Sequence, residues 1–340
     1  MIVRSFGSNG QFEVQDWTEE LTVIPNQWGT IGQMGIFAEE PVAEHVVVFE
    51  EITKDGALIV DRVRGDRAQV GKDASRKLHT FAVPHFPYAD AISPQDLQGK
   101  RAYGSPDEAE TLAAVRARKM ERIRQNHAWT LEFARAQAIT GGTVYAPNGT
   151  VTQNWNTEFG VTRKTVDFVL GTAGTEVIAK IEEGIAHIQD NANGEMVTGT
   201  VVLTSPEFFA KLIVHGSVKT AYQYYTSTQE PMRQRLGGDN ALHREFVHGG
   251  TRFVEMRDTY AGQRLIPSGK AYMVPTGTQQ VFRTYFSPAN RFGLVNTLGE
   301  QVYMFESADS KGTQIDIDSE SNFVNALLRP QLIVEFSSSN

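Results

Sequence analysis

The 340-residue chain contains no cysteine. This absence excludes disulfide bonds, thiolate metal sites and a cysteine nucleophile, and it suits a reducing compartment. Long apolar runs are also missing: no stretch approaches the roughly 18 consecutive apolar residues of a membrane-spanning helix. The first residues lack the basic start and apolar core of a signal peptide. The sequence therefore predicts no membrane segment and no secretion signal.

Basic residues are fewer than acidic ones: the chain has 32 Lys and Arg residues and 40 Asp and Glu residues, which gives a formal net charge of −8. Proteins that coat nucleic acid need clustered positive charge to release phosphate counterions. The balance argues against coating nucleic acid as the main task. The 30 glycines and 13 prolines indicate a globular chain rich in turns.

Signatures of catalysis and of cofactor binding are missing as well. The sequence has no Gly-x-Ser-x-Gly elbow, no dinucleotide fingerprint and no His-Glu-x-x-His zinc motif. Residues 65–72 place five residues between two glycines where a phosphate-binding loop needs four. Asp316, Asp318 and Glu320 alternate along a predicted strand and could bind a hard cation, but a solvated strand edge is the preferred explanation. We expect no enzymatic activity, no metal and no cofactor.

Glycine and proline punctuate the first 44 residues, which predicts an extended arm rather than a packed unit. Two β-rich runs, 45–49 and 57–63, flank Lys54-Asp55-Gly56, and Asp-Gly between such runs predicts a tight hairpin. Residues 64–77 have one large apolar residue, Val70, which predicts a solvated excursion before a strand over 78–83.

A long helix is predicted over 105–140. It begins with a capping box and a first-turn proline at 105–108, and the glycines at 141–142 suit its left-handed end. Its apolar residues form two stripes, so the helix should be buried from two directions, as a central strut. The residues assigned to its core are Met120, Ile123, Leu131 and Phe133.

The first half of this helix is basic, through Arg116, Arg118, Lys119, Arg122 and Arg124. These residues could contact nucleic acid. Acidic residues at 108, 110 and 121 lie within a turn or two, so a charged, solvated helix face is the preferred explanation.

The remainder of the chain has a more regular α/β pattern. Residues 143–160 are predicted as loop, 175–190 as a helix, 200–204 as a strand, and Ser205-Pro206-Glu207 as the start of a second helix. Residues 216–243 form a long polar loop, which usually has a partner or a function. Strands dominate from residue 246 onward, with one helical turn predicted at 322–328.

An arm, a projecting hairpin and large polar loops are costly to order in a monomer, because segments that pack on nothing keep their conformational entropy. They are expected when a neighbouring subunit supplies the missing contacts.

Three stretches resemble the major capsid protein family of tailed bacteriophages typified by the phage lambda capsid protein. They are Arg76 to Tyr103 (RKLHTFAVPHFPYADAISPQDLQGKRAY), Asn154 to Val161 (NWNTEFGV) and Ile266 to Pro330, which begins IPSGKAYMVPTGTQQVFRTYFSPANRFGLVNTLG. They are spread from residue 76 to residue 330 and follow the family's order and spacing.

The resemblance implies an α+β fold, the Hong Kong 97-like capsid fold. By this resemblance the chain would divide into an N-terminal arm (1–44), an extended E-loop hairpin reaching across a neighbour (45–90), a peripheral domain (91–160) with the spine helix 105–140, an axial domain (161–300), and C-terminal strands returning to the peripheral domain (301–340).

The same resemblance implies a major capsid protein that self-assembles, through hexamers and pentamers, into the icosahedral head shell around a double-stranded DNA genome. Its partners would be other copies, a scaffold, a portal and a decoration protein, with no sequence-specific DNA binding and no membrane. Its place would be the virion, after assembly in the host cytoplasm. Inter-subunit contacts are expected at the E-loop tip, at Arg64, Asp66, Arg67, Lys72 and Arg76.

Two alternatives stay open at this point. A cargo-enclosing bacterial nanocompartment shell shares the fold. A soluble cytoplasmic enzyme, with a catalytic triad brought together only by folding, would instead need a pocket with perturbed titratable groups.

Overall fold

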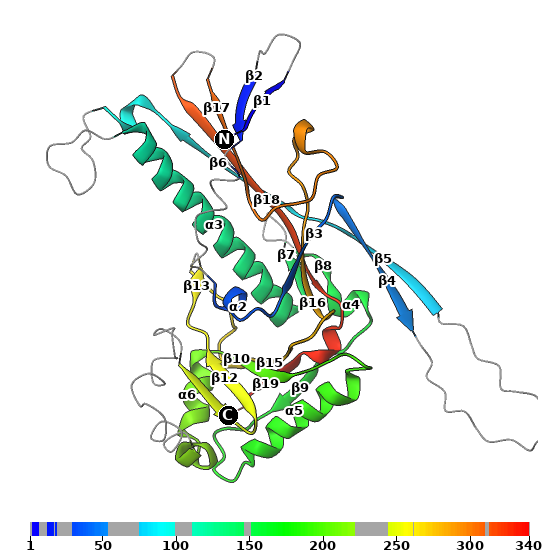
Figure 1. The fold of residues 1–340 in the computed structure, drawn as a ribbon. Coiled ribbons are helices and arrows are strands. Elements are labelled where there is room, and N and C mark those ends of the chain that lie inside the picture. The colour runs from blue at the N-terminus through cyan, green and yellow to red at the C-terminus, as the bar shows by residue number, and fades with distance from the viewer. Residues whose placement is uncertain are drawn as a thin grey trace, which may run out of the picture.

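The computed structural model describes residues 2–6, 12–16, 18, 29–53, 75–98, 111–145, 151–221, 244–260, 262–309 and 313–339. Two sheets dominate this part of the chain (Figure 1). A seven-stranded sheet runs beside the long helix α3. A six-stranded sheet forms the core of a second body, which lies near the C-terminal end of that helix. Helices and strands are mixed along the chain, which is the predicted α+β class.

The seven-stranded sheet contains β1 (Ile2–Phe6), β2 (Phe12–Asp16), β3 (Ala38–Pro41), β6 (His85–Ile92), β16 (Phe282–Phe286), β17 (Tyr303–Ala308) and β18 (Ile315–Leu327). The six-stranded sheet contains β9 (Lys164–Asp167), β10 (Gly199–Thr204), β11 (Glu245–His248), β12 (Thr251–Glu255), β15 (Lys270–Thr276) and β19 (Val334–Ser337). The two-stranded pairs are β4 (Val46–Thr53) with β5 (Ser75–Ala82), β7 (Thr143–Tyr145) with β8 (Val151–Asn154), and β13 (Thr259–Tyr260) with β14 (Gln263–Arg264).

The helices are α2 (Thr30–Gln33), α3 (Leu112–Gly141), α4 (Trp155–Glu158), α5 (Val177–Asn191) and α6 (Pro206–Val214). Short 3-10 turns are η1 (Pro94–Asp96), η2 (Phe292–Leu294) and η3 (Pro330–Leu332). The predicted helices over 175–190 and after Ser205 are confirmed as α5 and α6, and the predicted strand over 200–204 is β10. Ser205 caps α6 by accepting the amide hydrogen of Phe208 at 3.3 Å.

Helix α3 has 30 residues and is about 45 Å long at 1.5 Å per residue. Its predicted end is confirmed, because Gly142 adopts φ 64° and donates to the carbonyl of Ala138. The predicted start was wrong. Thr111 has extended backbone and caps the helix by accepting from Ala114 N at 3.2 Å, so no continuous helix runs from 105, and the predicted capping box lies outside the described residues.

Strand β18 lies beside α3 and joins most of the first sheet. It pairs antiparallel with β17 and β6 along its first half and with β16 along its second half. The predicted helical turn over 322–328 was therefore wrong. Side chains on both faces are buried from Ser319 to Leu327, and burial on two faces with hydrogen-bonded neighbours favours an extended strand over a local helical turn.

The predicted extended arm is a packed segment over residues 29–41. Glu132 of α3 accepts the amide hydrogens of Ile31 at 2.5 Å and Gly32 at 3.1 Å, Ile31 is fully buried, and β3 pairs parallel with β16. A side chain at Gly29 would lie 2.6 Å from the Glu132 carboxylate. Earlier in the chain, β2 adds the β1–β2 hairpin to the edge of β17. These pairings order the described parts of the arm within the subunit.

The Asp-Gly turn and the second strand predicted for its hairpin, 57–63, lie outside the described residues. Strand β4 pairs with β5, from Val46 opposite Ala82 to Thr53 opposite Ser75, and residues 54–74 between them lie outside the described residues. Phe49 and Phe81 pack together at 5.4 Å between ring centroids, and both contact Trp155. Burial of these aromatic rings holds β4 against β5.

The loop predicted over 143–160 was also wrong, since it contains β7, β8 and the single turn α4. The side chain of Asn154 caps α4, and the fully buried Trp155 follows it. The short helix thus places one large aromatic ring under the β4–β5 hairpin.

Two strands lie in a different sheet from the one predicted by the domain division. Strand β16 belongs to the first sheet, although 161–300 was assigned to the axial domain. Strand β19 pairs with β15 and β9 in the second sheet, so 301–340 does not return as a whole to the first. Phe336 of β19 is buried against Phe168 at 4.6 Å, and this burial holds the last strand in the second body.

Candidate assembly surfaces

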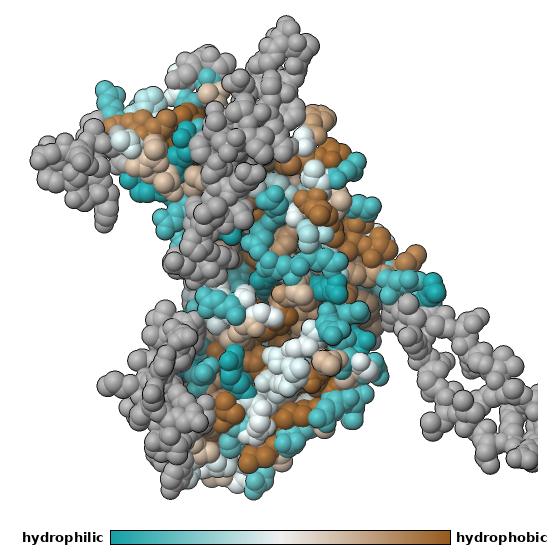
Figure 2. Space-filling model, in the orientation of Figure 1, coloured by the Kyte–Doolittle hydropathy of each residue, from teal (hydrophilic) through white to brown (hydrophobic). Residues whose placement is uncertain are grey.

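The β4–β5 hairpin has two different faces. Its inner face carries Val47, Phe49, His79 and Phe81, which are buried or packed against the subunit's own core. Its outer face is exposed and carries three large apolar side chains: Val46, Val48 and Leu78 are 39%, 54% and 69% exposed. Side chains alternate along a strand, so one pairing register produces both faces. Figure 2 shows apolar surface where this hairpin leaves the body.

The base of the hairpin is fixed by a polar contact as well as by aromatic packing. The ring of His79 is fully buried, and its Nδ1 lies 2.8 Å from the carboxylate of Glu158 at the end of α4. The same ring packs on Phe159 at 4.8 Å between centroids. The hairpin direction is therefore set by contacts from α4, and the outer face is held pointing away from the subunit.

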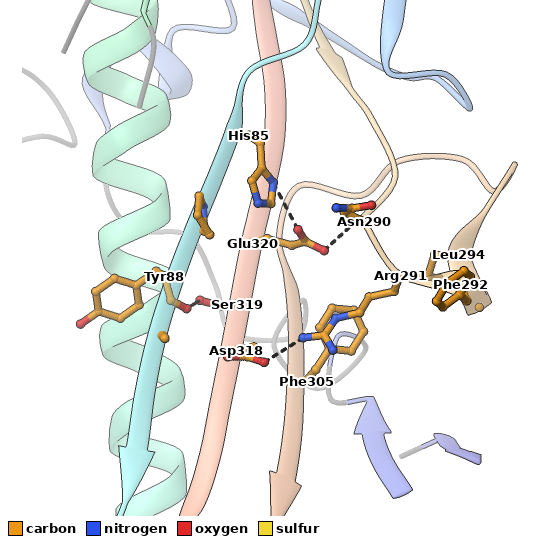
Figure 3. A pocket seen from close by; sticks show the side chains of 13 residues that line it. His85, Tyr88, Asn290, Arg291, Phe292, Leu294, Phe305, Asp318, Ser319 and Glu320 are labelled. Atoms are coloured by element: carbon orange, nitrogen blue, oxygen red, sulfur yellow. Dashed lines mark hydrogen bonds and ion pairs between the residues drawn. The ribbon is translucent and has the colours of Figure 1, made fainter. Parts of the chain in front are cut away.

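A second exposed surface lies on the face of the first sheet opposite α3. On the α3 side, Ile317 and Met304 pack with Ile123 of the helix. On the other side, His85, Pro87 and Ala89 of β6 and Asp318 and Glu320 of β18 line a cavity of about 670 Å³ (Figure 3). The remaining lining residues are Tyr88, Asn290, Arg291, Phe292, Gly293, Leu294, Phe305 and Ser319. We call this cavity the sheet groove.

Charged groups of the sheet groove are paired with one another. His85 Nδ1 lies 3.2 Å from Glu320 and 2.7 Å from the side-chain oxygen of Asn322, and Glu320 also accepts from Asn290 N at 2.9 Å. Burial raises the pKa of Glu320. Arg291 donates to Asp318 at 2.8 Å and lies over the Phe305 ring at 4.7 Å. These pairs give the groove a charged rim around apolar walls.

The proposed cation site at Asp316, Asp318 and Glu320 does not come together. Asp318 and Glu320 have the partners named above, and Asp316 accepts from the side-chain amide of Gln314 at 2.6 Å. Across the described ranges no group of three or more His, Asp or Glu side chains could hold a metal ion. Their alternation does mark the groove face, which is the signal that could have located it from sequence.

The core residues predicted for α3 occupy different clusters. Met120 and Ile123 are buried with Val302, Met304 and Ile317. Leu131 is buried with Phe86, Phe286 and Phe323, and Phe133 is half-buried in the main core with its ring edge against Tyr145 at 5.3 Å. The helix thus contacts both bodies through different residues.

Basic residues of α3 pair with acidic residues from strands. Arg116 donates twice to Glu306 of β17, each at 2.7 Å, and Lys119 lies 2.8 Å from Asp90 of β6, which also pairs with Arg122. The sequence pattern indicated acidic residues at 108, 110 and 121 as the pairing partners. The observed partners are Glu306 and Asp90 instead. Carboxylates of the sheet neutralise the charges of Arg116, Lys119 and Arg122. This pairing favours a structural role for the basic half of the helix.

Of the five residues expected at the E-loop tip, Arg64, Asp66, Arg67 and Lys72 lie outside the described residues. Arg76 is at the end of β5, exposed on the outer face, and donates to Glu50 across the strand pair at 3.3 Å. The sequence located charge near the hairpin end but did not indicate the apolar residues beside it.

His127 on α3 predicts a pH dependence of stability. It is buried between α3 and the sheet, with Nε2 3.0 Å from the Ser319 hydroxyl and its ring edge-on to Tyr88. Burial, and secondly the charge of Arg124, lowers the pKa of His127 from 6.5 to about 4. The unfolded chain therefore binds more protons between these values, and stability is full above the unfolded pKa and falls on acidification.

We expect His127 to remove about 3 kcal/mol from the free energy of unfolding between neutral pH and about pH 4. Denaturant titrations across this range measure the slope. His127→Gln should flatten it. An unchanged slope in His127→Gln would contradict the assignment.

The described residues include no helix long and apolar enough to cross a membrane.

Similarity to known proteins extends over nearly the whole chain. The chain is 46% identical over 338 residues to the major capsid protein of Pseudomonas phage KPP10, covering 95% of this chain and 96% of that protein. It is 28% identical over 357 residues to the major capsid protein of Salmonella phage Felix O1, covering 96% of each.

Solved structures share the fold at low sequence identity. The mature capsid of bacteriophage PhiM1 matches with a TM-score of 0.53 and 14% identity over 89% of this chain and 85% of that one. The capsid of the Myoviridae phage XM1 matches with a TM-score of 0.56 and 11% identity over 93% and 94%. These matches confirm the expected Hong Kong 97-like capsid fold.

A family model described as phage major capsid protein E matches residues 13–338. This match spans the six-stranded sheet, the seven-stranded sheet apart from β1, helix α3 and the exposed hairpin, and it agrees with the 46% identical relative. The chain belongs to the phage major capsid protein E family.

Proposed function

We propose that copies of this chain associate into hexamers and pentamers and close into the icosahedral head shell of a tailed bacteriophage, around its double-stranded DNA. The observation that carries this proposal is the β4–β5 hairpin, whose inner face is packed and whose outer face exposes Val46, Val48 and Leu78. Contiguous apolar surface of this kind marks an interaction site, because burying it releases about 25 cal/mol per Å². Family membership supports a second copy as the partner.

In this proposal each part of the chain is assigned to one domain of the capsid protein. Residues 45–90 act as the E-loop, 1–44 as the N-terminal arm, and 91–160 with β16, β17 and β18 as the peripheral domain around α3. The second sheet with α5 and α6, including β19, acts as the axial domain. The subunit is a building block and performs no catalytic step.

Assembly in this proposal draws on many weak contacts. A subunit with several neighbours gains avidity, and a closed shell leaves no unpaired edge. Exposed ion pairs add little affinity, so apolar contacts supply most of the energy, and the charges at Arg64, Asp66, Arg67 and Lys72 set the register. The net charge of −8 suits a container, since a wall that bound DNA tightly would oppose packing and release.

The proposed partners of the shell are a scaffold, a portal and a decoration protein. In this proposal the chain assembles in the host cytoplasm and is then part of the virion. DNA is enclosed without sequence-specific contacts.

Deleting residues 64–72 tests the E-loop assignment. We expect a folded subunit with wild-type circular dichroism that forms no shells, because the loop can no longer reach a neighbour. A replacement of the same length by glycine and serine separates the effect of length from that of charge. Electron microscopy scores the particles, and shells of normal size and yield from the deletion variant would contradict the assignment.

A further inference from the structure

We propose that a small monovalent anion of the size of chloride binds between helix α3 and the seven-stranded sheet, beside the guanidinium of Arg124. Three features of the described residues support this site: a buried cation without a carboxylate partner, a cavity next to it, and the chemistry of the cavity wall. The site lies within one subunit, so it is independent of the proposed shell function.

The buried cation is the side chain of Arg124, which is only 7% exposed. Its Nε and Nη1 atoms are buried and make no hydrogen bond within the part of the chain that the structure describes. Its Nη2 atom donates to the side-chain oxygen of Gln301 at 3.4 Å, which is long for a hydrogen bond. A guanidinium in a protein stays protonated. A full positive charge is therefore buried with two of its donor atoms unused.

The carboxylate that acts on this charge, Glu39, is bound to other groups. Glu39 accepts from Arg135 at 2.8 Å and from the side-chain nitrogen of Gln301 at 2.5 Å. The Gln301 amide thus has its nitrogen bonded to the carboxylate and its oxygen bonded to Arg124. Burial lowers the pKa of Arg124, and the charge of Glu39 opposes this shift without cancelling it. An unpaired buried cation is costly, so the folded chain gains stability from a counterion.

A cavity of about 10 Å³ lies beside Arg124, where α3 runs along the sheet (Figure 1). Its lining comes from α3, from the two residues before β17, and from β18: Arg124, His127, Ala128, Leu131, Gln301, Val302 and Ser321. Space of this size holds one water molecule or one monatomic ion. Larger anions such as sulfate or an organic acid do not fit. A bound ion would contact both the helix and the sheet.

The wall of this cavity suits a halide ion better than a metal ion or a water molecule. Among the described residues that line it, none is acidic, so a metal cation would meet the guanidinium without a carboxylate ligand. A water molecule would accept hydrogen bonds from Arg124 but leave its charge unpaired. A chloride ion can accept from Nε and Nη1 and also neutralise the charge. Chloride is weakly hydrated, so it tolerates contact with the apolar side chains of Ala128, Leu131 and Val302.

Thermal melting of the purified protein in sodium chloride and in sodium gluconate tests the site. Gluconate is too large for the cavity, and equal ionic strength keeps the screening of surface ion pairs the same in both salts. We expect chloride to raise the melting temperature by about 2–4 °C, because an ion that binds only the folded chain stabilises it by mass action. The rise should saturate with chloride concentration, and bromide should act in the same way.

The variant Arg124→Met removes the buried charge and should lose the difference between the two salts, and Arg124→Gln is a second neutral variant for the case that the first does not fold. The matched control Arg118→Met, at an exposed arginine of the same helix, should keep the difference.

Anomalous scattering from bromide in crystals of the wild-type subunit locates the ion without any variant, and we expect a peak beside Nε and Nη1 of Arg124. Equal melting temperatures of the wild type in the two salts, an undiminished chloride effect in Arg124→Met, or a water molecule at the place of the expected peak would each overturn the proposal.

Discussion

The variant Leu131→Asp is expected to abolish folding. Leu131 is 7% exposed and packs in a cluster with Phe86, Phe286 and Phe323, where helix α3 meets β6, β16 and β18. A carboxylate there would be buried among apolar side chains, and the packing of the leucine would be lost, which together cost several kcal/mol. Because a domain is stable by only about 5–15 kcal/mol, we expect the soluble yield to be lost.

The matched control is Ala117→Asp, the same kind of replacement at an exposed position of the same helix. It should express and melt like the wild type. Soluble yield, circular dichroism and thermal melting compare the two variants. Wild-type yield and melting of Leu131→Asp would show that α3 is not the buried strut of this fold.

The double variant Val48→Asp with Leu78→Asp is expected to abolish assembly while preserving the fold. Both side chains are largely exposed in the subunit, so the replacements remove little internal packing. Between copies they would place two charges in an apolar contact, and this penalty repeats at every contact of the shell. Light scattering should report only free subunits or small oligomers, with an unchanged melting temperature.

Ile178→Asp, at an exposed apolar residue of α5 away from the hairpin, is the control for loss of surface hydrophobicity alone. It should assemble. Shells from the hairpin double variant at wild-type yield would show that the outer face is not an assembly surface.

Local signals in the sequence predicted the features that depend on neighbouring residues. Ser205 before a proline predicted the start of α6, and the glycine pair after the long helix predicted its left-handed end at Gly142. The resemblance to phage capsid proteins predicted the fold and the family, both confirmed by comparison. The first two signals act within a few residues of the helix end that they predict, whereas the resemblance depends on segments spread along the chain.

Features set by tertiary pairing could not be predicted in this way. Strand β4 pairs with β5 because Phe49 and Phe81 meet over Trp155, more than 70 residues further along the chain. The helical turn predicted at 322–328 is strand because β16 pairs with it. No local pattern contains these partners.

The buried polar residues of α3 were missed for the same reason. Glu132 and His127 look like ordinary helix-surface residues in the sequence, and both are buried. Glu132 binds the backbone of residues 31 and 32, and His127 contacts Ser319, so their partners lie about 100 and 192 residues away. The groove was missed because its floor comes from β6 and β18, whose register the sequence did not reveal.

The central claim is that copies of this chain form a closed shell through contacts with one another. Negative-stain electron microscopy of the purified protein, with light scattering for mass, tests it most directly. The account predicts closed icosahedral particles, or pentamers and hexamers, in equilibrium with subunits. A homogeneous monomer or dimer that persists at high concentration would contradict it.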